Sequence, residues 1–176
     1  MRILLIAGGW STEREVSLQG AASMAGALRS LGHAVTLFDL QRFDELSTQA
    51  TAHDLAIINL HGEPGEDGLV QAMLDRLHVP YQGSGPAGSF LALHKACAKQ
   101  LVIRAGIRTP RFEFLPCPPT ASWKPALPFP LFVKSETGGS SIHLAKVTDQ
   151  ESLKAVMQEI FAAGCGVLIE ELIEGQ

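Results

Sequence analysis

The sequence predicts an α/β fold, in which a parallel-sheet domain is followed by part of a second, α+β domain. Short apolar runs alternate with helical patterns over residues 1–92, which is typical of a parallel sheet. Six of the ten prolines then fall within residues 116–130, which indicates a loop. Two apolar runs on either side of the Gly-Gly-Ser-Ser tract at 138–141 have the pattern of an antiparallel hairpin. We therefore expect domains at residues 1–92 and 93–176.

The composition is that of a chain able to form a core. Of the 176 residues, 46% are hydrophobic and 18% are charged, which excludes a disordered chain. The formal net charge of −4 argues against a nucleic-acid-binding protein, since such proteins are normally basic. No apolar run approaches the roughly 18 residues of a membrane span, and residues 2–7 are too few for a signal-peptide core. The three scattered cysteines suggest neither a zinc site nor disulfides, so we expect a cytoplasmic protein with no membrane partner.

The elements of the first domain follow from hydrophobic periodicity. The apolar run 2–7, directly before two glycines, predicts a buried strand and a tight turn. Thr12 and Glu15 have capping-box spacing, and a helical apolar face then extends to Gly32. Further strands are expected at 34–37, 55–60 and 79–81, and a further helix at 69–77.

The second domain opens with a helix that carries two lysines and continues into the hairpin. Thr148 and Glu151 form a second capping-box pattern, which predicts a helix that ends near Ala162. Strands are expected at 131–134, 142–147 and 167–171. Nothing follows the last strand to complete a sheet, so we expect this domain to be incomplete.

The first candidate site is the turn Gly8-Gly9-Trp10-Ser11. It matches neither the dinucleotide-binding pattern G-x-G-x-x-G nor the P-loop pattern. The turn nevertheless follows a parallel strand, and open α/β sheets bind ligands at the carboxyl ends of their strands. Glu13 has two interpretations. A carboxylate in a first helical turn usually serves the helix dipole, whereas the alternative is that Glu13 binds a cationic amine.

The second candidate site is the loop Leu60–Gly68, which also follows a strand. Its glycines and proline predict a sharp loop with His61 at the strand end. A lone histidine is often structural, but this position, level with the Glu13 turn, favours a role in a site. Glu66 and Asp67 are interpreted as caps of the next helix.

Lysines provide the third group of candidates. The stretch Arg76–Arg111 contains no acid and carries a formal charge of +6. Within it, Lys95 and Lys99 lie four residues apart on an expected helix. Spacing alone favours a solvated basic face, and the alternative is a helix that supplies a cation to phosphates.

The hairpin and the last strand suggest a nucleotide site. Lys134 at a strand end, beside the glycine-rich turn 138–141, can hold a polyphosphate through its charge and through backbone amides and hydroxyls, although linkers share this composition. The apolar strand that leads to Glu170 can place an adenine against its backbone, with Glu170 accepting a hydrogen bond from the amino group.

In this order, the sequence resembles the D-alanine–D-alanine ligases of the ATP-grasp superfamily. The matching stretches are GGWSTEREVSL, LHGEPGEDGLVQAMLD, VPYQGSGP, the helix with Lys95 and Lys99, AGIRTP, FPLFVK, GGSS and VLIEELIEG. They cover essentially the whole chain, yet correspond to only the N-terminal domain and about half of the central region. The resemblance implies a Rossmann-like, pre-ATP-grasp domain over 1–92 and an incomplete ATP-grasp domain over 93–176.

The resemblance also implies an activity. Enzymes of this family use ATP and Mg²⁺ to activate one D-alanine as an acyl phosphate, and the amine of a second D-alanine then attacks to form a dipeptide for peptidoglycan. The family's metal ligands correspond to positions beyond residue 176, so we assign no metal ligand here and expect the isolated chain to be inactive. The expected partners are D-alanine, ATP and, for the whole protein, a second copy in a homodimer.

Residue roles carry over by position. The resemblance implies that Glu13 holds the ammonium of the first D-alanine, that His61 orients its carboxylate, and that Ser140 hydrogen-bonds to Glu13. The residues expected to bind the nucleotide are Lys95, Lys134 and Ser141 on the phosphates, and Glu170 with the backbone of Glu171 and Ile173 on the adenine.

Two positions depart from the family pattern and keep alternatives open. Ser135 stands where the family usually has proline, and His143 stands where it usually has glycine. If the latter position requires a positive φ, histidine is strained there. These departures motivate a second hypothesis, a non-catalytic paralogue that binds a nucleotide or an amino acid. A ligase that joins D-alanine to D-lactate or D-serine also stays open.

Overall fold

The computed structural model describes residues 1–138 and 143–175. The chain divides into two units, Met1–Leu91 and Ala92–Gln176, and each has its own sheet and its own core. None of the helices in the described residues is long and apolar enough to cross a membrane.

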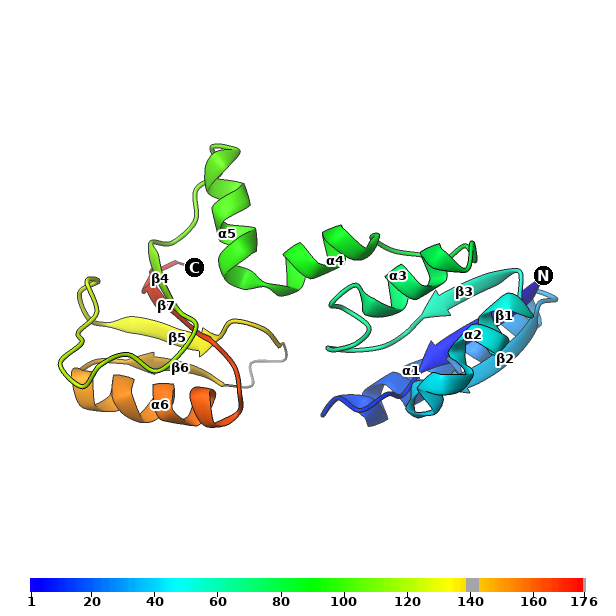
Figure 1. Ribbon diagram of the computed structural model, residues 1–176, viewed down its shortest axis with the longest axis horizontal. Coiled ribbons are helices and arrows are strands. Elements are labelled where there is room, and N and C mark those ends of the chain that lie inside the picture. Colours follow the sequence, from blue (N-terminus) through cyan, green and yellow to red (C-terminus); the bar gives the residue numbers. More distant parts are fainter. Residues whose placement is uncertain (139–142, 176) are drawn as a thin grey trace. The chain divides into compact units, whose positions relative to one another are not determined.

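The first unit is built around a three-stranded parallel sheet. Its order is β2-β1-β3, with β1 at Arg2–Ala7, β2 at Ala34–Asp39 and β3 at Leu55–Ile58. Figure 1 shows β1 between the other two strands. All of β1 after Arg2 is buried, as expected for a central strand covered on both faces. The predicted parallel sheet is therefore confirmed.

Helices cover both faces of this sheet. Alternate β1 side chains face opposite ways, and Leu5 packs with Ala21 and Ala25 of α1 (Arg14–Ser30). On the other face, Leu4 shares a core with residues of α2 (Leu46–Thr51) and α3 (Leu69–Arg76). The remaining elements of this unit are η1 (Leu40–Glu45) and α4 (Pro86–Leu93), the latter of which contains the boundary between the units.

Two details of the first unit differ from the prediction. The N-cap of α1 is Glu13, without a side-chain cap hydrogen bond, so the expected capping box of Thr12 and Glu15 is wrong. The predicted strand over 79–81, which lies in the part of the chain that the structure describes, does not form. Tyr81 makes a single parallel bridge with Ala56, because the next amide of β3, that of Ile58, donates to the Gln82 side chain at 2.9 Å and not to a backbone carbonyl.

The second unit contains a four-stranded antiparallel sheet with the order β4-β7-β5-β6. Its elements are α5 (Lys95–Arg104), β4 (Phe112–Leu115), β5 (Leu131–Ser135), β6 (Leu144–Val147), α6 (Gln150–Ala162) and β7 (Val167–Glu171). The pairing of β5 with β6 confirms the predicted hairpin. The last strand, β7, lies between β4 and β5 rather than at an edge, because the unpredicted β4 pairs with its other side.

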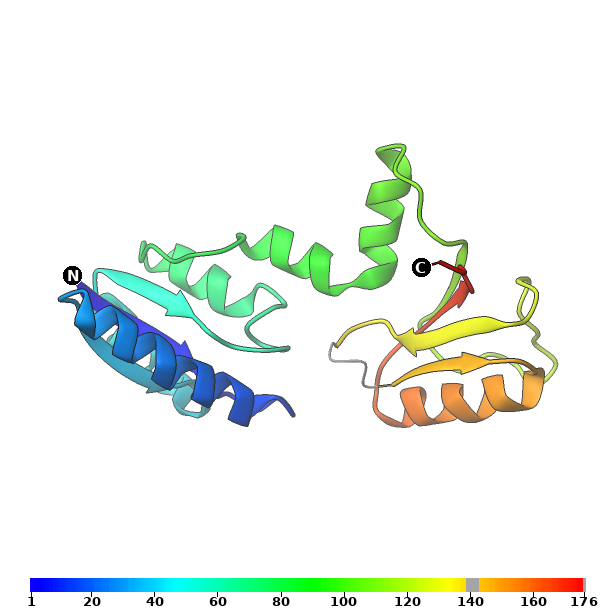
Figure 2. The same ribbon diagram turned by 180° about the vertical axis from the view of Figure 1, so that it is seen from behind.

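Helix α6 covers one face of this sheet, as both ribbon views show (Figures 1 and 2). Its buried residues Leu153, Met157 and Ile160 recur at helical spacing and pack in a core with β5 and β7. The N-cap is Asp149, whose side chain accepts a hydrogen bond from the Ser152 backbone N–H at 2.8 Å. The predicted cap at Thr148 is therefore one residue early.

Candidate functional site

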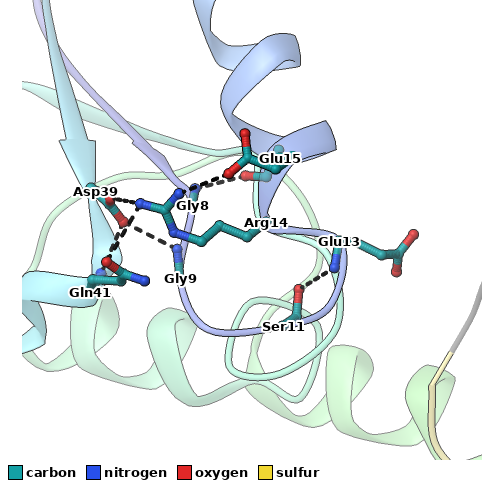
Figure 3. Close-up of polar contacts among 9 residues, drawn as sticks. Gly8, Gly9, Ser11, Glu13, Arg14, Glu15, Asp39 and Gln41 are labelled. Atoms are coloured by element: carbon teal, nitrogen blue, oxygen red, sulfur yellow. Dashed lines mark hydrogen bonds and ion pairs between the residues drawn. The ribbon is translucent and has the colours of Figure 1, made fainter.

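The turn that follows β1 carries Glu13 at the amino end of α1. Gly8 and Gly9 have φ values of 73° and 77°, a left-handed conformation that glycine adopts without strain. The Glu13 backbone N–H donates to Ser11 Oγ at 3.2 Å, which closes the turn. Figure 3 shows the Glu13 side chain directed away from the neighbouring side chain of Arg14. The half-buried Glu13 thus lies beyond the carboxyl end of β1, where the sequence predicts a ligand site.

Buried polar contacts join this turn to the end of β3. The fully buried Ser17 of α1 accepts from the Gly8 N–H at 2.8 Å, and its hydroxyl donates to the Asn59 carbonyl. Asn59 Nδ2 in turn donates to the Ser17 carbonyl at 2.7 Å. Because His61 follows Asn59 by two residues, these contacts place the Glu13 turn and the His61 loop at the same edge of the sheet. A side chain added at Gly62 would lie 3.5 Å from Ser11 Cβ, which confirms that the two loops are neighbours.

The loop after His61 is held by its own hydrogen bonds. The Gly62 N–H donates to Glu66 Oε2 at 3.0 Å, and the Glu66 N–H returns a bond to the Gly62 carbonyl at 2.9 Å. Glu66 therefore closes this loop and does not cap a helix, contrary to the prediction. Asp67 does accept from the N–H of Leu69, the first residue of α3, at 2.9 Å.

In the second unit, a buried carboxylate lies between two lysines. Glu170 of β7 contacts Lys99 Nζ through Oε1 at 2.7 Å and Lys134 Nζ through Oε2 at 2.6 Å. Glu170 and Lys99 are each 8% exposed. Burial disfavours the charged carboxylate, but hydrogen bonds from Lys134 and Lys99 outweigh it and hold the pKa of Glu170 below its ordinary value.

The position of Lys99 differs from the one that its spacing predicts. Spacing favoured a solvated basic face, but the side chain is buried, donates to Thr109 Oγ1 at 2.6 Å and lies 5.0 Å from the centre of the Phe112 ring. The available signal was Glu170 itself, since a buried acid on a strand requires a cation.

Lys95 contacts backbone carbonyls at the start of the glycine-rich segment. Its Nζ donates to the carbonyls of Glu136 at 3.2 Å and Gly138 at 2.7 Å. Burial lowers the pKa of Lys95, and the positive charge of Lys134 lowers it further. The charges of Lys95 and Lys134 thus act on one another, so both lysines lie in one region of this unit. Ser140 and Ser141 lie outside the described residues.

The two departures from the family pattern meet in one hydrogen bond. His143 has a φ of 54°, so the position that is usually glycine does adopt the left-handed conformation here. The backbone N–H of Ser135 donates to the His143 carbonyl at 3.2 Å. A proline at position 135 would lack this donor. Ser135 therefore adds a backbone hydrogen bond to the strained residue.

Glu171 and Ile173 border a separate hollow at the end of β7. Arg111 donates to Glu171 from its backbone N–H at 2.8 Å and from Nε at 2.7 Å. The hollow has a volume of about 680 Å³ and is lined by Ile103, Gly106, Ile107, Arg108, Thr109, Pro110, Glu171 and Ile173. Its mainly apolar walls suit a flat heterocycle.

In residues 1–138 and 143–175, no three His, Cys, Asp or Glu side chains lie close enough together to hold a metal ion. All three cysteines are free thiols, and Cys97 and Cys117 are exposed.

Comparison with known proteins identifies the group that this chain resembles. A family model described as "D-ala D-ala ligase C-terminus" matches residues 104–176. The chain is 56% identical to the D-alanine–D-alanine ligase of Desulfovibrio desulfuricans over 177 aligned residues, which cover all of this chain. The chain resembles the D-alanine–D-alanine ligases over its whole length. It spans about 58% of the length of that ligase.

Solved ligase structures share the fold. The D-alanine–D-alanine ligase of Bacillus anthracis superposes with a TM-score of 0.89 at 33% identity, over 99% of this chain and 58% of that one. The same ligase complexed with ATP gives a TM-score of 0.86 at 31% identity, over 99% of this chain and 60% of that one. The parallel sheet followed by an antiparallel sheet is thus the fold of the corresponding part of an ATP-grasp ligase.

Proposed function

We propose that this chain supplies the first-substrate site and part of the nucleotide site of an ATP-dependent D-alanine–D-alanine ligase. The joining of the Glu13 turn to the His61 loop through Ser17 and Asn59 carries this proposal. It brings a carboxylate and an imidazole to the ligand-binding edge of a parallel sheet, in a chain similar to such ligases.

Each side chain has a role in holding an amino acid. The Glu13 carboxylate binds the ammonium of the first D-alanine, because opposite charges form strong hydrogen bonds when partly shielded from water. The His61 imidazole lies beside the substrate carboxylate and orients it. Ser140 hydrogen-bonds to Glu13 in this proposal.

The second unit binds ATP in the proposal. Lys95 and Lys134, with Ser141, hold the phosphates, and Glu170 accepts from the adenine amino group beside the backbone of Glu171 and Ile173. Both lysines lie near Glu170, and the hollow beside Glu171 and Ile173 has the apolar walls that a purine requires. Mg²⁺ would neutralise phosphate charge, but the described residues offer no cluster of ligands for it.

The proposed reaction proceeds in two balanced steps. An oxygen of the first D-alanine carboxylate attacks the γ-phosphorus of ATP, and ADP leaves, which gives an acyl phosphate. The amine of a second D-alanine then attacks the acyl carbon, phosphate leaves with the electron pair of the C–O bond, and the ammonium loses a proton. Because water would hydrolyse the acyl phosphate, residues that hold the first substrate must also exclude solvent.

The same reasoning extends to the whole protein. We propose a Rossmann-like, pre-ATP-grasp substrate domain over 1–92, part of an ATP-grasp domain over 93–176, a homodimer and a cytoplasmic, peptidoglycan-building role. Light scattering of the purified protein measures the oligomeric state.

Phosphate release tests the activity. The protein expressed from its complete reading frame should release phosphate from Mg-ATP only when D-alanine is present. Glu13→Gln should raise the KM for D-alanine by at least tenfold and leave the KM for ATP within twofold. Asp44→Asn is the matched control, since Asp44 is an exposed acid of the same unit that lies outside the Glu13 turn. Phosphate release that does not depend on D-alanine would contradict the proposal.

Two alternatives are read from the same assay. One is a D-alanine–D-serine ligase, since VanG of Enterococcus faecalis, a D-Ala:D-Ser ligase, superposes with a TM-score of 0.78 at 25% identity over 99% of this chain and 63% of that one. Dipeptide formation with D-serine or D-lactate as the second substrate would favour that class. The other is the non-catalytic paralogue suggested by the left-handed His143, which would bind D-alanine or ATP without releasing phosphate.

A further inference from the structure

One carboxylate contacts both ends of the turn that carries Glu13. Asp39, at the end of β2, accepts from the Gly9 backbone N–H at 3.3 Å and forms an ion pair with the Arg14 guanidinium. Asp39 Oδ1 also accepts from the Gln41 N–H at 3.1 Å, which holds the carboxylate in place. Gly9 opens the turn and Arg14 follows Glu13 directly, so Asp39 closes the turn into a ring, as Figure 3 shows.

The turn is packed closely against this carboxylate. A side-chain carbon added at Gly8 would lie well inside van der Waals contact of Asp39 Oδ1, so the backbone at Gly8 runs directly against it. The Arg14 and Asp39 side chains are 26% and 31% exposed, which shields their ion pair more than a surface pair. Among the described residues, Arg14 Nε is buried without a hydrogen-bond partner, so the guanidinium is held through its Nη atoms, by Asp39, Gln41 and Glu15.

We propose that Asp39 and Arg14 are positioning residues for the first amino-acid substrate. Their ion pair sets the path of residues 9–14 and thereby the direction of the Glu13 carboxylate, which points away from the pair (Figure 3). This inference rests on the proposed function in one respect, namely that Glu13 binds the substrate ammonium. Displacing a binding group by about 1 Å is enough to lose substantial affinity or rate.

A second ion pair in the same unit distinguishes positioning from general stabilisation. Arg2 Nη2 contacts Asp54 Oδ1 at 2.7 Å, also between the sheet and a following segment, but at the amino end of β1. Breaking it removes an ion pair of the same chemistry without touching the Glu13 turn. Asp54→Asn is therefore the matched control for Asp39→Asn.

Trp10 provides a readout that needs no enzymatic activity. It lies in the turn, is 55% exposed, and its ring stands edge-on to Phe43 with centroids 5.9 Å apart. The only other tryptophan is Trp123. In a Trp123→Phe background, Asp39→Asn should change the emission maximum and acrylamide quenching of Trp10, whereas Asp54→Asn should leave both unchanged. Unchanged Trp10 fluorescence in Asp39→Asn would overturn the proposal.

Kinetics then test the link to substrate. In the protein expressed from its complete reading frame, Asp39→Asn should raise the KM for D-alanine at least tenfold, with the KM for ATP within twofold and Asp54→Asn unchanged. Arg14→Lys keeps the positive charge but loses the planar guanidinium, so it should raise the KM for D-alanine by a smaller factor. This variant replaces Asp39→Asn in the test if Asp39→Asn fails to fold. A Trp10 change with equal effects on both KM values would overturn the positioning role. If the wild type shows no D-alanine-dependent phosphate release, the proposed function is wrong. The fluorescence comparison still tests whether Asp39 holds the turn that carries Trp10.

Discussion

At the scale of single residues, replacing either of two glycines by alanine should change the free energy of unfolding in opposite directions. Gly8→Ala places a methyl group against Asp39 in a left-handed backbone, so we expect a loss of at least about 1–2 kcal/mol in the free energy of unfolding. Gly26→Ala, inside α1 with no atom within 4 Å of the new carbon, should instead stabilise by about 1 kcal/mol. Urea denaturation of both variants measures the difference. Equal effects of the two substitutions would show that the turn is not packed as described.

Glu170 gives a pH-dependent prediction. Because its pKa is lower in the folded chain than in the unfolded one, the unfolded state binds more protons between the two values. The stability that Glu170 contributes is therefore fully present above the ordinary glutamate pKa of about 4.3, and it is lost as the pH falls through the depressed folded pKa. Replacement by Gln leaves Lys99 and Lys134 without their anion and should cost about 3 kcal/mol at pH 7.

Denaturation across pH checks this. The difference in unfolding free energy between wild type and Glu170→Gln should be constant above pH ~5 and shrink below it. Glu159→Gln is the control, since Glu159 is an exposed acid of α6 and its loss should change stability little. A difference that stays constant down to pH 2 would mean that Glu170 is not held charged by the lysines.

At the scale of elements, α6 provides a direct test of its buried face. Leu153 is fully buried against the sheet, so Leu153→Ala should cost about 2–5 kcal/mol. Its exposed neighbour Lys154 should tolerate alanine within about 0.5 kcal/mol. Thermal and urea unfolding distinguish the two. Comparable losses would mean that the helix is rotated from the described orientation.

Local patterns predicted most of these elements, because a buried strand shows in the sequence as an apolar run and a buried helix face shows as apolar residues at helical spacing. The runs of β1 and β7 and the helical spacing of α6 are visible in the sequence and match the structure. Strand β4 escaped prediction, because its residues Phe112–Leu115 gain a partner only through β7, far along the chain. The N-cap of α6 also lies one residue after its predicted position. Whether Thr148 or Asp149 caps the helix depends on the backbone path, which local spacing does not determine.

In the candidate site, too, some residues could be found from local sequence patterns, whereas others depend on contacts between distant parts of the chain. Glu13 and His61 could be singled out because they follow strand ends, which motif reading detects. The burial of Lys99 and the contact of Asp39 with Arg14 could not, because each pair joins a helix residue to the end of a strand elsewhere in the chain.

At the scale of the whole molecule, the two units have separate cores. No core cluster in residues 1–138 and 143–175 draws members from both units. Residues 1–91 expressed alone should therefore unfold in one cooperative transition, as observed for most small single domains. Near-ultraviolet circular dichroism during urea unfolding measures this, with Leu74→Ala as a destabilised reference. A gradual, non-cooperative loss of signal would show that this core depends on the second unit.

The lysines around Glu170 also make the second unit sensitive to its buffer. The region holds three cations and two anions, Lys95, Lys99 and Lys134 against Glu136 and Glu170, and so has one excess positive charge. An ion that binds only the folded form raises its melting temperature, and the stabilisation grows with the logarithm of the ion concentration once this exceeds Kd. Multivalent anions such as tripolyphosphate should therefore raise the melting temperature of this unit, and added sodium chloride should weaken the effect by screening. Melting temperatures of this chain are comparable only between buffers of matched anion content.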